Sequence, residues 1–223
     1  LSAVMLGGCD QLLEVRVPGA VSASTLEDPA MMASLAAGAL GQVECALAHY
    51  IDGQAIMADE YISAAFWRNF NVWGAKLLDL RNWGGDCQTT NDASNLGFFT
   101  ALSKARFMAD DAFKQIEAFP AADLPFNQGQ MLSMLAAYAG YAYVMLGEGY
   151  CEMAIDGSAL LTRAQVFEMG LAKFKKAEQL AQAANDQSIK NMALVGQARL
   201  LLDLGRKAEA AAREEIRIGD HDF

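Results

Sequence analysis

The stretch FNQGQMLSMLAAYAGYAYVMLGEG, residues 126–149, decides the expected fold of this chain. Nearly every residue in it is apolar or small, and such residues favour helix. We expect a helix from about Phe126 to Met145, stopped by the glycines of Gly147-Glu148-Gly149. A helix that is apolar on all sides is buried, so this one should lie at the centre of a bundle. No stretch approaches the ~20 apolar residues of a membrane-spanning helix.

Helical patterns continue on both sides of this stretch. Thr162 and Gln165 have the capping-box spacing that opens a helix, and Asp28-Pro29 combines a cap oxygen with an early proline. In the first helix, Gly38 and Gly41 indicate close packing against another backbone. Residues 10–25 look extended. Helices are expected over residues 25–50, 92–119, 126–145, 162–184, 188–204 and 206–216.

Composition and charge exclude several classes of protein. The chain has 223 residues, of which 53% are hydrophobic, so it can bury a sizeable core and is not intrinsically disordered. It carries 27 acidic against 17 basic residues, a formal charge of −10. This balance argues against nucleic-acid binding and against docking on anionic lipid through a basic face.

Residue patterns for catalysis are missing. The chain has two His, no Cys-x-x-Cys pair, no Gly-x-Ser-x-Gly and no glycine-rich nucleotide loop, so we expect no enzyme, no cofactor and no zinc site. Two pairs of neighbouring carboxylates remain, Asp59-Glu60 and Asp110-Asp111. Adjacent helical residues point about 100° apart and cannot both face one cleft, so we expect solvated acidic faces.

Residues 51–91 form an irregular, tryptophan-rich insert that is the best binding candidate. Sugar rings have apolar faces that stack on aromatic planes, and their hydroxyls need fixed polar partners. The alternative is that the aromatic side chains anchor the insert to the bundle, with Trp83 beside Gly84-Gly85 the most exposed of them. The candidate ligand-binding residues are Trp67, Trp73, Arg81, Asn82, Trp83 and Asp86.

The first nine residues have the pattern of a cut lipoprotein signal. An apolar run leads into Leu6-Gly7-Gly8-Cys9, which fits a lipobox, and Cys9 would then carry the lipid that anchors the protein to a membrane. Cys45, Cys87 and Cys151 remain. In an oxidising compartment we expect one pair, Cys87 with Cys151, while Cys45 on a helical face is expected to be a small buried hydrophobe.

The joints between the later helices resemble those of tetratricopeptide repeats. Leu204-Gly205-Arg206 with Ala208-Glu209-Ala210 matches the turn between the two helices of such a repeat. The pair 126–147 with 162–184 has a longer joint than the repeat allows. The fold is therefore expected to be all-α, a tetratricopeptide-like bundle of helical hairpins over 126–216 with a loop-rich insert; a generic helical bundle is the alternative.

Several segments, in order, resemble the SusD/RagB family of outer-membrane nutrient-binding lipoproteins. Each match is modest, and their order along the chain carries the resemblance. The loop Glu148 to Ala154 departs from the family pattern, because it lacks a proline. The matching segments are Cys9 to Pro18, Ala105-Arg106 with Ala109-Asp110-Asp111, Ala137-Tyr138 to Tyr150, Leu161 to Phe167, and Ala198-Arg199-Leu200 to Gly205.

The resemblance implies a lipoprotein of the outer membrane, held by Cys9 and facing the cell surface. It implies capture of a glycan or other nutrient and delivery to a TonB-dependent transporter, without enzymatic activity. With the lipobox pattern, residues 1–9 are expected to be a signal remnant. Members of the family are usually longer, so residues 10–223 are expected to be the front part of a truncated helical domain. The alternative function is a repeat scaffold lipoprotein that binds other envelope proteins.

Overall fold

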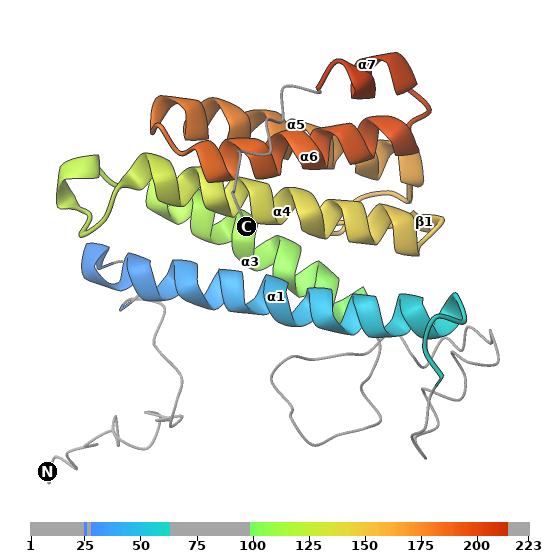
Figure 1. Ribbon diagram of the computed structural model, residues 1–223. Helices are drawn as coiled ribbons and strands as arrows, with labels where there is room; N and C mark the ends of the chain where they lie inside the picture. Colours follow the sequence, from blue (N-terminus) through green and yellow to red (C-terminus); the bar gives the residue numbers. More distant parts are fainter. Residues whose placement is uncertain (1–24, 26–27, 63–98, 214–223) are drawn as a thin grey trace, which may run out of the picture.

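The computed structural model describes residues 25, 28–62 and 99–213 and is all-α, as expected. Six α-helices account for most of these residues, and the described strands form one two-stranded hairpin (Figure 1). The elements are η3 (Pro29–Met31), α1 (Met32–Met57), α3 (Phe99–Glu117), η6 (Ala121–Asp123), α4 (Gln128–Gly149), β1 (Glu152–Met153), β2 (Leu161–Thr162), α5 (Arg163–Ala183), α6 (Gln187–Asp203) and α7 (Lys207–Ala211).

Helix α4 lies at the centre, as its composition predicts. It contacts α1, α3, α5 and α6, and the layers follow the chain from α1 through α3 and α4 to α5 and α6 (Figure 1). Leu135, Ala137, Ala142 and Val144 of α4 are completely buried. A helix with neighbours on several sides has no solvent face, which explains why this stretch carries almost no charge.

The helix starts are set by local side-chain hydrogen bonds. Asp28 accepts a hydrogen bond from the Ala30 amide at 2.9 Å, directly before Pro29. Thr162 and Gln165 form the expected capping box at the start of α5, in which the Thr162 amide donates to Gln165 Oε1 at 2.8 Å. Such caps satisfy amides that have no partner within the helix.

The joints after α5 and α6 are three residues long and share one geometry. Asn185 and Gly205 occupy the left-handed region, with φ of 55° and 74°. In each joint the amide of the following residue donates a hydrogen bond to a carbonyl in the last turn of the preceding helix, Asp186 to Ala181 and Arg206 to Leu201. This is the Schellman ending, which reverses the chain and places α5, α6 and α7 as successive antiparallel neighbours (Figure 1).

Close helix packing occurs at glycines other than those expected. The ring of Phe174 on α5 is completely buried in a notch made by Gly140 of α4 and Gly196 of α6. By contrast, a Cβ atom added at Gly38 or Gly41 would meet no described atom within 4 Å. The expectation for these two was wrong, because both lie on the exposed side of α1.

Helix α1 differs from the sequence expectations in two further ways. It continues to Met57, so the first seven residues assigned to the insert 51–91 are helical. Its end is a Schellman turn at Asp59, with φ of 64°. By length and composition the segment Pro29–Met57 is also apolar enough to cross a membrane, contrary to our expectation, although buried core helices and signal sequences meet the same criterion.

Candidate functional site

The predicted ligand-binding residues and the predicted lipid attachment site lie outside the described residues. Trp67, Trp73, Arg81, Asn82, Trp83 and Asp86 fall in 63–98, and Cys9 precedes residue 25. Their assignments therefore stay predictions. The described residues contain a different candidate site, which includes the carboxylate pair Asp110-Asp111 that we expected to be solvated.

This site is a pocket of about 370 Å³ between α3, α4, α5 and the loop that joins α4 to α5. We call it the Arg106 pocket. Its walls combine three cations, three carboxylates, a tyrosine and an exposed phenylalanine. The lining residues are Arg106, Phe107, Asp110, Asp111, Lys114, Tyr143, Asp156, Met169, Ala172 and Lys173.

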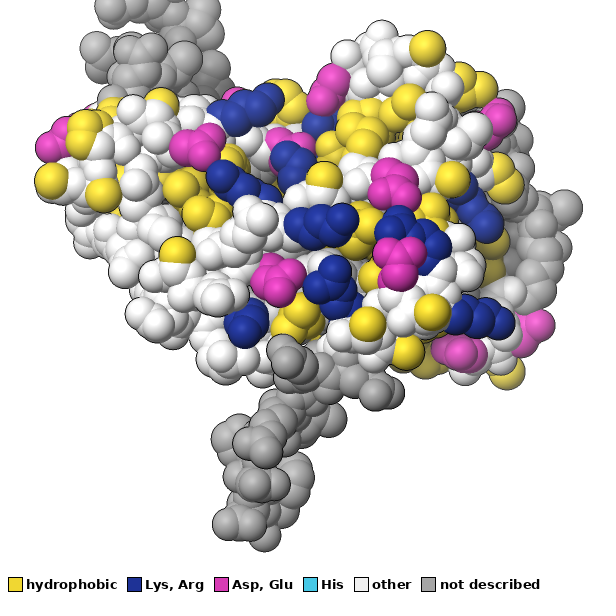
Figure 2. Space-filling model, turned by 90° about the horizontal axis from the view of Figure 1, so that it is seen from above, with side chains coloured by type: hydrophobic (Ala, Val, Ile, Leu, Met, Phe, Trp, Pro, Cys, Tyr) yellow, Lys and Arg dark blue, Asp and Glu magenta, His cyan; other side chains and the backbone are white. Residues whose placement is uncertain are grey.

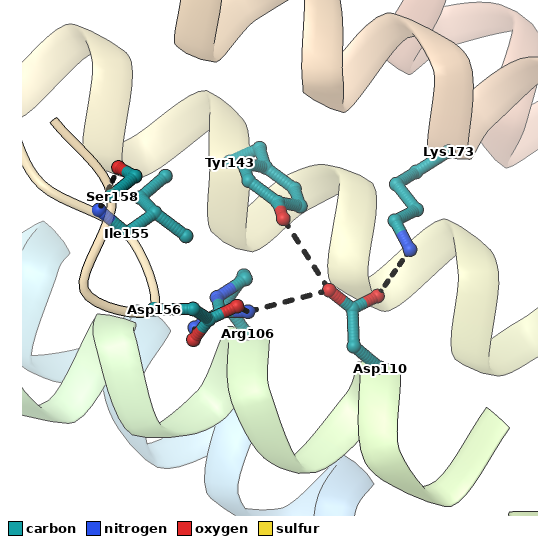
Figure 3. Close-up of polar contacts among 7 residues, drawn as sticks. All are labelled: Arg106, Asp110, Tyr143, Ile155, Asp156, Ser158 and Lys173. Carbon is teal, nitrogen blue, oxygen red and sulfur yellow. Dashed lines mark hydrogen bonds and ion pairs between the residues drawn. The ribbon is translucent and has the colours of Figure 1, made fainter. Parts of the chain in front are cut away.

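The strongest contact in the pocket joins α3 to the α4–α5 loop. Arg106 donates two hydrogen bonds to the carboxylate of Asp156, Nη1 to Oδ2 at 2.7 Å and Nη2 to Oδ1 at 2.5 Å (Figure 3). Paired bonds of this kind match the planar fork of a guanidinium to the two oxygens of a carboxylate. The two partners differ in exposure: the Arg106 side chain is 7% exposed and that of Asp156 is 58% exposed.

Asp110 is the fixed anion of the pocket. Its carboxylate is 10% exposed and lies 2.5 Å from Lys173 Nζ and 3.6 Å from Arg106 Nη1. It also accepts a hydrogen bond from the Tyr143 hydroxyl at 3.3 Å (Figure 3). Three elements, α3, α4 and α5, therefore meet at this one carboxylate, and a buried charge with several partners is costly to disturb.

The structure corrects our expectation for Asp110 and Asp111. We placed this pair on a solvated face, but Asp110 is buried and both residues line the pocket. They do so from different positions: Asp110 faces the ion pairs, whereas Asp111 accepts a hydrogen bond from Gln115 along α3 at 2.6 Å. The divergence of adjacent side chains thus spreads the pair across one concave wall.

A tight turn positions Asp156. Asp156 and Gly157 have φ of 51° and 74°, and they form the tip of the loop between β1 and β2. Ser158 stabilises the turn, because its hydroxyl accepts from the Ile155 amide at 3.1 Å and donates to the Ala159 carbonyl at 2.8 Å. A non-glycine residue in the left-handed region is uncommon, and such residues cluster at functional sites.

The charges of the pocket shift the pKa values of its residues. The hydrogen bonds from Arg106 lower the pKa of Asp156, which is therefore ionised at neutral pH. Burial, followed by the nearby Asp110 carboxylate, raises the pKa of Tyr143 to about 12. Neither residue is poised to exchange a proton near pH 7. Among the described residues, no group of three or more His, Cys, Asp or Glu could hold a metal ion.

A second charged cluster, at the end of α4, joins three helices. Glu148 accepts two hydrogen bonds from Arg199 of α6, both at 2.6 Å, and one from the Tyr50 hydroxyl of α1 at 3.0 Å. Burial, together with Glu148, raises the pKa of Asp203. This cluster ties α1 and α6 to α4 and does not line the Arg106 pocket.

The cysteines do not pair as expected. Cys151 is free and exposed, which rules out a bond with Cys87. Cys45, expected to be a buried hydrophobe, is half-buried and disulfide-bonded. Position on a helical face therefore did not identify the cysteine that forms a bond.

The sequence contained one usable signal for the Arg106 pocket. Arg106 and Asp110 stand at i and i+4 on the same face of α3 as the buried Leu102 and Ala109. Opposite charges on an apolar face are rare unless they are paired, so this spacing indicates a buried ion pair. Asp156 had no comparable signal, since 50 residues separate it from Arg106.

Comparisons with protein-family models, with curated proteins and with solved structures give no match to this chain.

Proposed function

We propose that this chain belongs to a non-enzymatic envelope lipoprotein of the SusD/RagB type, which binds a glycan or other nutrient at the outer-membrane surface and delivers it to a TonB-dependent transporter. The observation that carries the binding part of the proposal is the Arg106 pocket. The order of the segments that resemble the family supports the location and the partner.

The pocket has the chemistry that a polar nutrient requires. Its volume of about 370 Å³ suits a small ligand or one unit of a larger one. Phe107, 52% exposed at the rim, offers an aromatic plane, while Lys114 and Asp111 offer a donor and an acceptor for hydroxyl groups. The other four charged side chains, Arg106, Asp110, Asp156 and Lys173, are held in ion pairs, with none placed as an activated nucleophile, which favours binding over catalysis.

The lipid anchor is tested by metabolic labelling. Cells that express the full-length protein with its native leader are fed a labelled fatty acid, beside a Cys9→Ala variant. We expect label and membrane-fraction recovery for the parent and loss of both for the variant. Equal labelling of the two proteins would contradict lipidation at Cys9.

The transporter and the nutrient are tested on the same material. Mild cross-linking before membrane solubilisation, followed by mass spectrometry, should recover a TonB-dependent transporter. A panel of saccharides should include at least one that raises the melting temperature of the purified protein, because a ligand that binds only the folded state stabilises it. Neither a transporter nor a stabilising saccharide would be expected if the protein were a scaffold.

One observation favours that second candidate, a scaffold that binds other envelope proteins. Residues 163–213 carry nine Lys and Arg against five Asp and Glu, in a chain whose net charge is −10. Figure 2, which looks onto α5, α6 and α7, shows Lys and Arg side chains along the middle of this face, with Asp and Glu side chains among them. An acidic protein surface would complement it. Recovery of an acidic envelope protein other than a transporter, lost at high salt, would favour the scaffold.

A further inference from the structure

We infer that the Arg106 pocket binds a sugar that carries a carboxylate, of the uronic-acid type, and that the ligand's carboxylate takes the place of Asp156 on Arg106. In the structure as it stands, Asp156 occupies the position of the ligand's charged group. This inference rests on the proposed binding function and names the class of ligand for it.

The first step is that Arg106 requires an anion. Its side chain is almost completely buried, and a guanidinium stays protonated in proteins. A buried cation without a partner is strongly unfavourable. In addition, Arg106 Nε has no hydrogen-bond partner among the described residues. The guanidinium is thus held by Asp156 at its two terminal nitrogens while Nε is buried, so a ligand carboxylate would take over the two terminal donors.

The second step is that Asp156 is the exchangeable anion and Asp110 is not. Asp110 is buried and contacts Lys173, Tyr143 and Arg106 at once. Asp156 is largely exposed, has Arg106 as its only ion-pair partner among the described residues, and stands at the tip of a turn with a left-handed backbone. When it leaves Arg106, its carboxylate enters water, where a charged group is well solvated. The exchange therefore replaces one carboxylate by another of the same geometry.

The third step concerns the remainder of the ligand. The guanidinium carbon of Arg106 lies 5.9 Å from the centre of the Phe107 ring, so a carboxylate on Arg106 brings its attached group close to an exposed aromatic plane. A sugar ring presents an apolar face to such a plane. Lys114 and Asp111, at the same pocket, suit its hydroxyl groups. A simple aliphatic acid would gain the ion pair alone, and a neutral sugar the ring and hydroxyl contacts without the ion pair.

If the ligand's carboxylate replaces Asp156, neutralising Asp156 should affect binding differently from neutralising another carboxylate of the pocket. Removing the charge of Asp156 removes the competitor of the ligand for Arg106, since a neutral amide binds a guanidinium more weakly than a carboxylate does. Removing the charge of Asp111 changes the net charge of the pocket by the same amount, but Asp111 does not contact Arg106. Asp156→Asn and Asp111→Asn are therefore matched variants with different expected effects.

The experiment is isothermal titration of the purified chain with D-glucuronate, D-glucose and acetate. For the unmodified protein we expect glucuronate to bind at least tenfold more tightly than glucose or acetate. Asp156→Asn should tighten glucuronate binding about tenfold, and Asp111→Asn should change it less than threefold. Arg106→Lys keeps the charge but loses the fork, and should weaken binding at least tenfold; circular dichroism establishes whether this variant is folded.

Several results would overturn the inference. Equal gains from Asp156→Asn and Asp111→Asn would mean attraction by net charge, and weaker binding by Asp156→Asn would make Asp156 part of the ligand site. Glucose binding as tightly as glucuronate would exclude the carboxylate while the proposed function stands. If acetate matches glucuronate, the site takes any small carboxylate and the sugar is excluded. Glucuronate binding by a protein without lipid or transporter would instead support the inference and contradict the proposed function.

Discussion

Replacement of Gly196 by alanine should destabilise the protein, although alanine is the better helix former. The ring of Phe174 fills a notch between Gly196 and Gly140 and is completely buried. A Cβ atom at Gly196 would lie 2.6 Å from Phe174 Cε2 and closer still to two other ring atoms. Ordinary carbon contacts are about 3.5–4.0 Å, so the ring or α6 must move by about 1 Å.

The magnitude follows from two opposing effects. Overpacking of a core costs about 1–3 kcal/mol, and the upper end applies because the ring cannot retreat towards α4, where a Cβ at Gly140 would itself be only 2.7 Å from Cε1. The gain in helix propensity from Gly to Ala is about 1 kcal/mol. The net loss should be about 2 kcal/mol, or about 4–8 °C in Tm for a domain of this size.

The assay is urea unfolding followed by circular dichroism, with a matched substitution on the surface. Gly38→Ala makes the same change within α1, about two turns from its start, where the added atom meets no described neighbour, and should raise the free energy of unfolding by up to about 1 kcal/mol. Combining Gly196→Ala with Phe174→Leu should recover at least about 1 kcal/mol relative to the sum of the single changes. Two results would refute the claim that Gly196 makes room for the Phe174 ring. One is a Gly196→Ala protein as stable as the parent, and the other is a double variant whose loss of stability equals the sum of the two single losses.

Three further predictions concern single residues and use the same unfolding assay. Thr162→Ala removes the cap of α5 and should cost about 1 kcal/mol, while Thr162→Ser should cost much less; equal losses would contradict the capping role. Gly205→Ala should cost about 1–2 kcal/mol because φ is 74°, and Gly205→Asn less, since Asn185 fills the equivalent place. Partial burial and Glu148 raise the pKa of Asp203, so the folded state binds its proton more tightly and stability falls as pH rises through this pKa. Asp203→Asn should therefore raise stability at pH 7, by less than about 1 kcal/mol after solvent screening. If the free energy of unfolding depended on pH equally in the parent and the variant, this prediction would be wrong.

The helices could be predicted because their signals are local. The capping box at Thr162 and the glycine turn at Gly205 act within a few residues, so the sequence contains the whole interaction. The central place of α4 also followed from composition, because an uncharged helix must be covered on all sides. The end of α1 was missed by seven residues, since its last turn closes at Asp59 and not at a glycine.

The glycines show where reasoning from local sequence fails. Gly38 and Gly41 have the spacing of a packing face but are exposed, whereas Gly140 and Gly196 make the notch for Phe174. Any helical glycine permits close approach of a neighbouring helix, and which glycines are used for it depends on which helix faces meet.

By itself, the sequence determined the all-α class, most helix boundaries, the burial of α4 and the acidic character of the chain. Only the tertiary structure decided the Arg106 pocket, because Arg106, Asp156 and Lys173 come from α3, a loop turn and α5. Ion pairs between such distant residues form only when packing aligns the helices and a turn aims one carboxylate. The charged residues are visible in the sequence, but they form a pocket only because three helices pack together around Asp110.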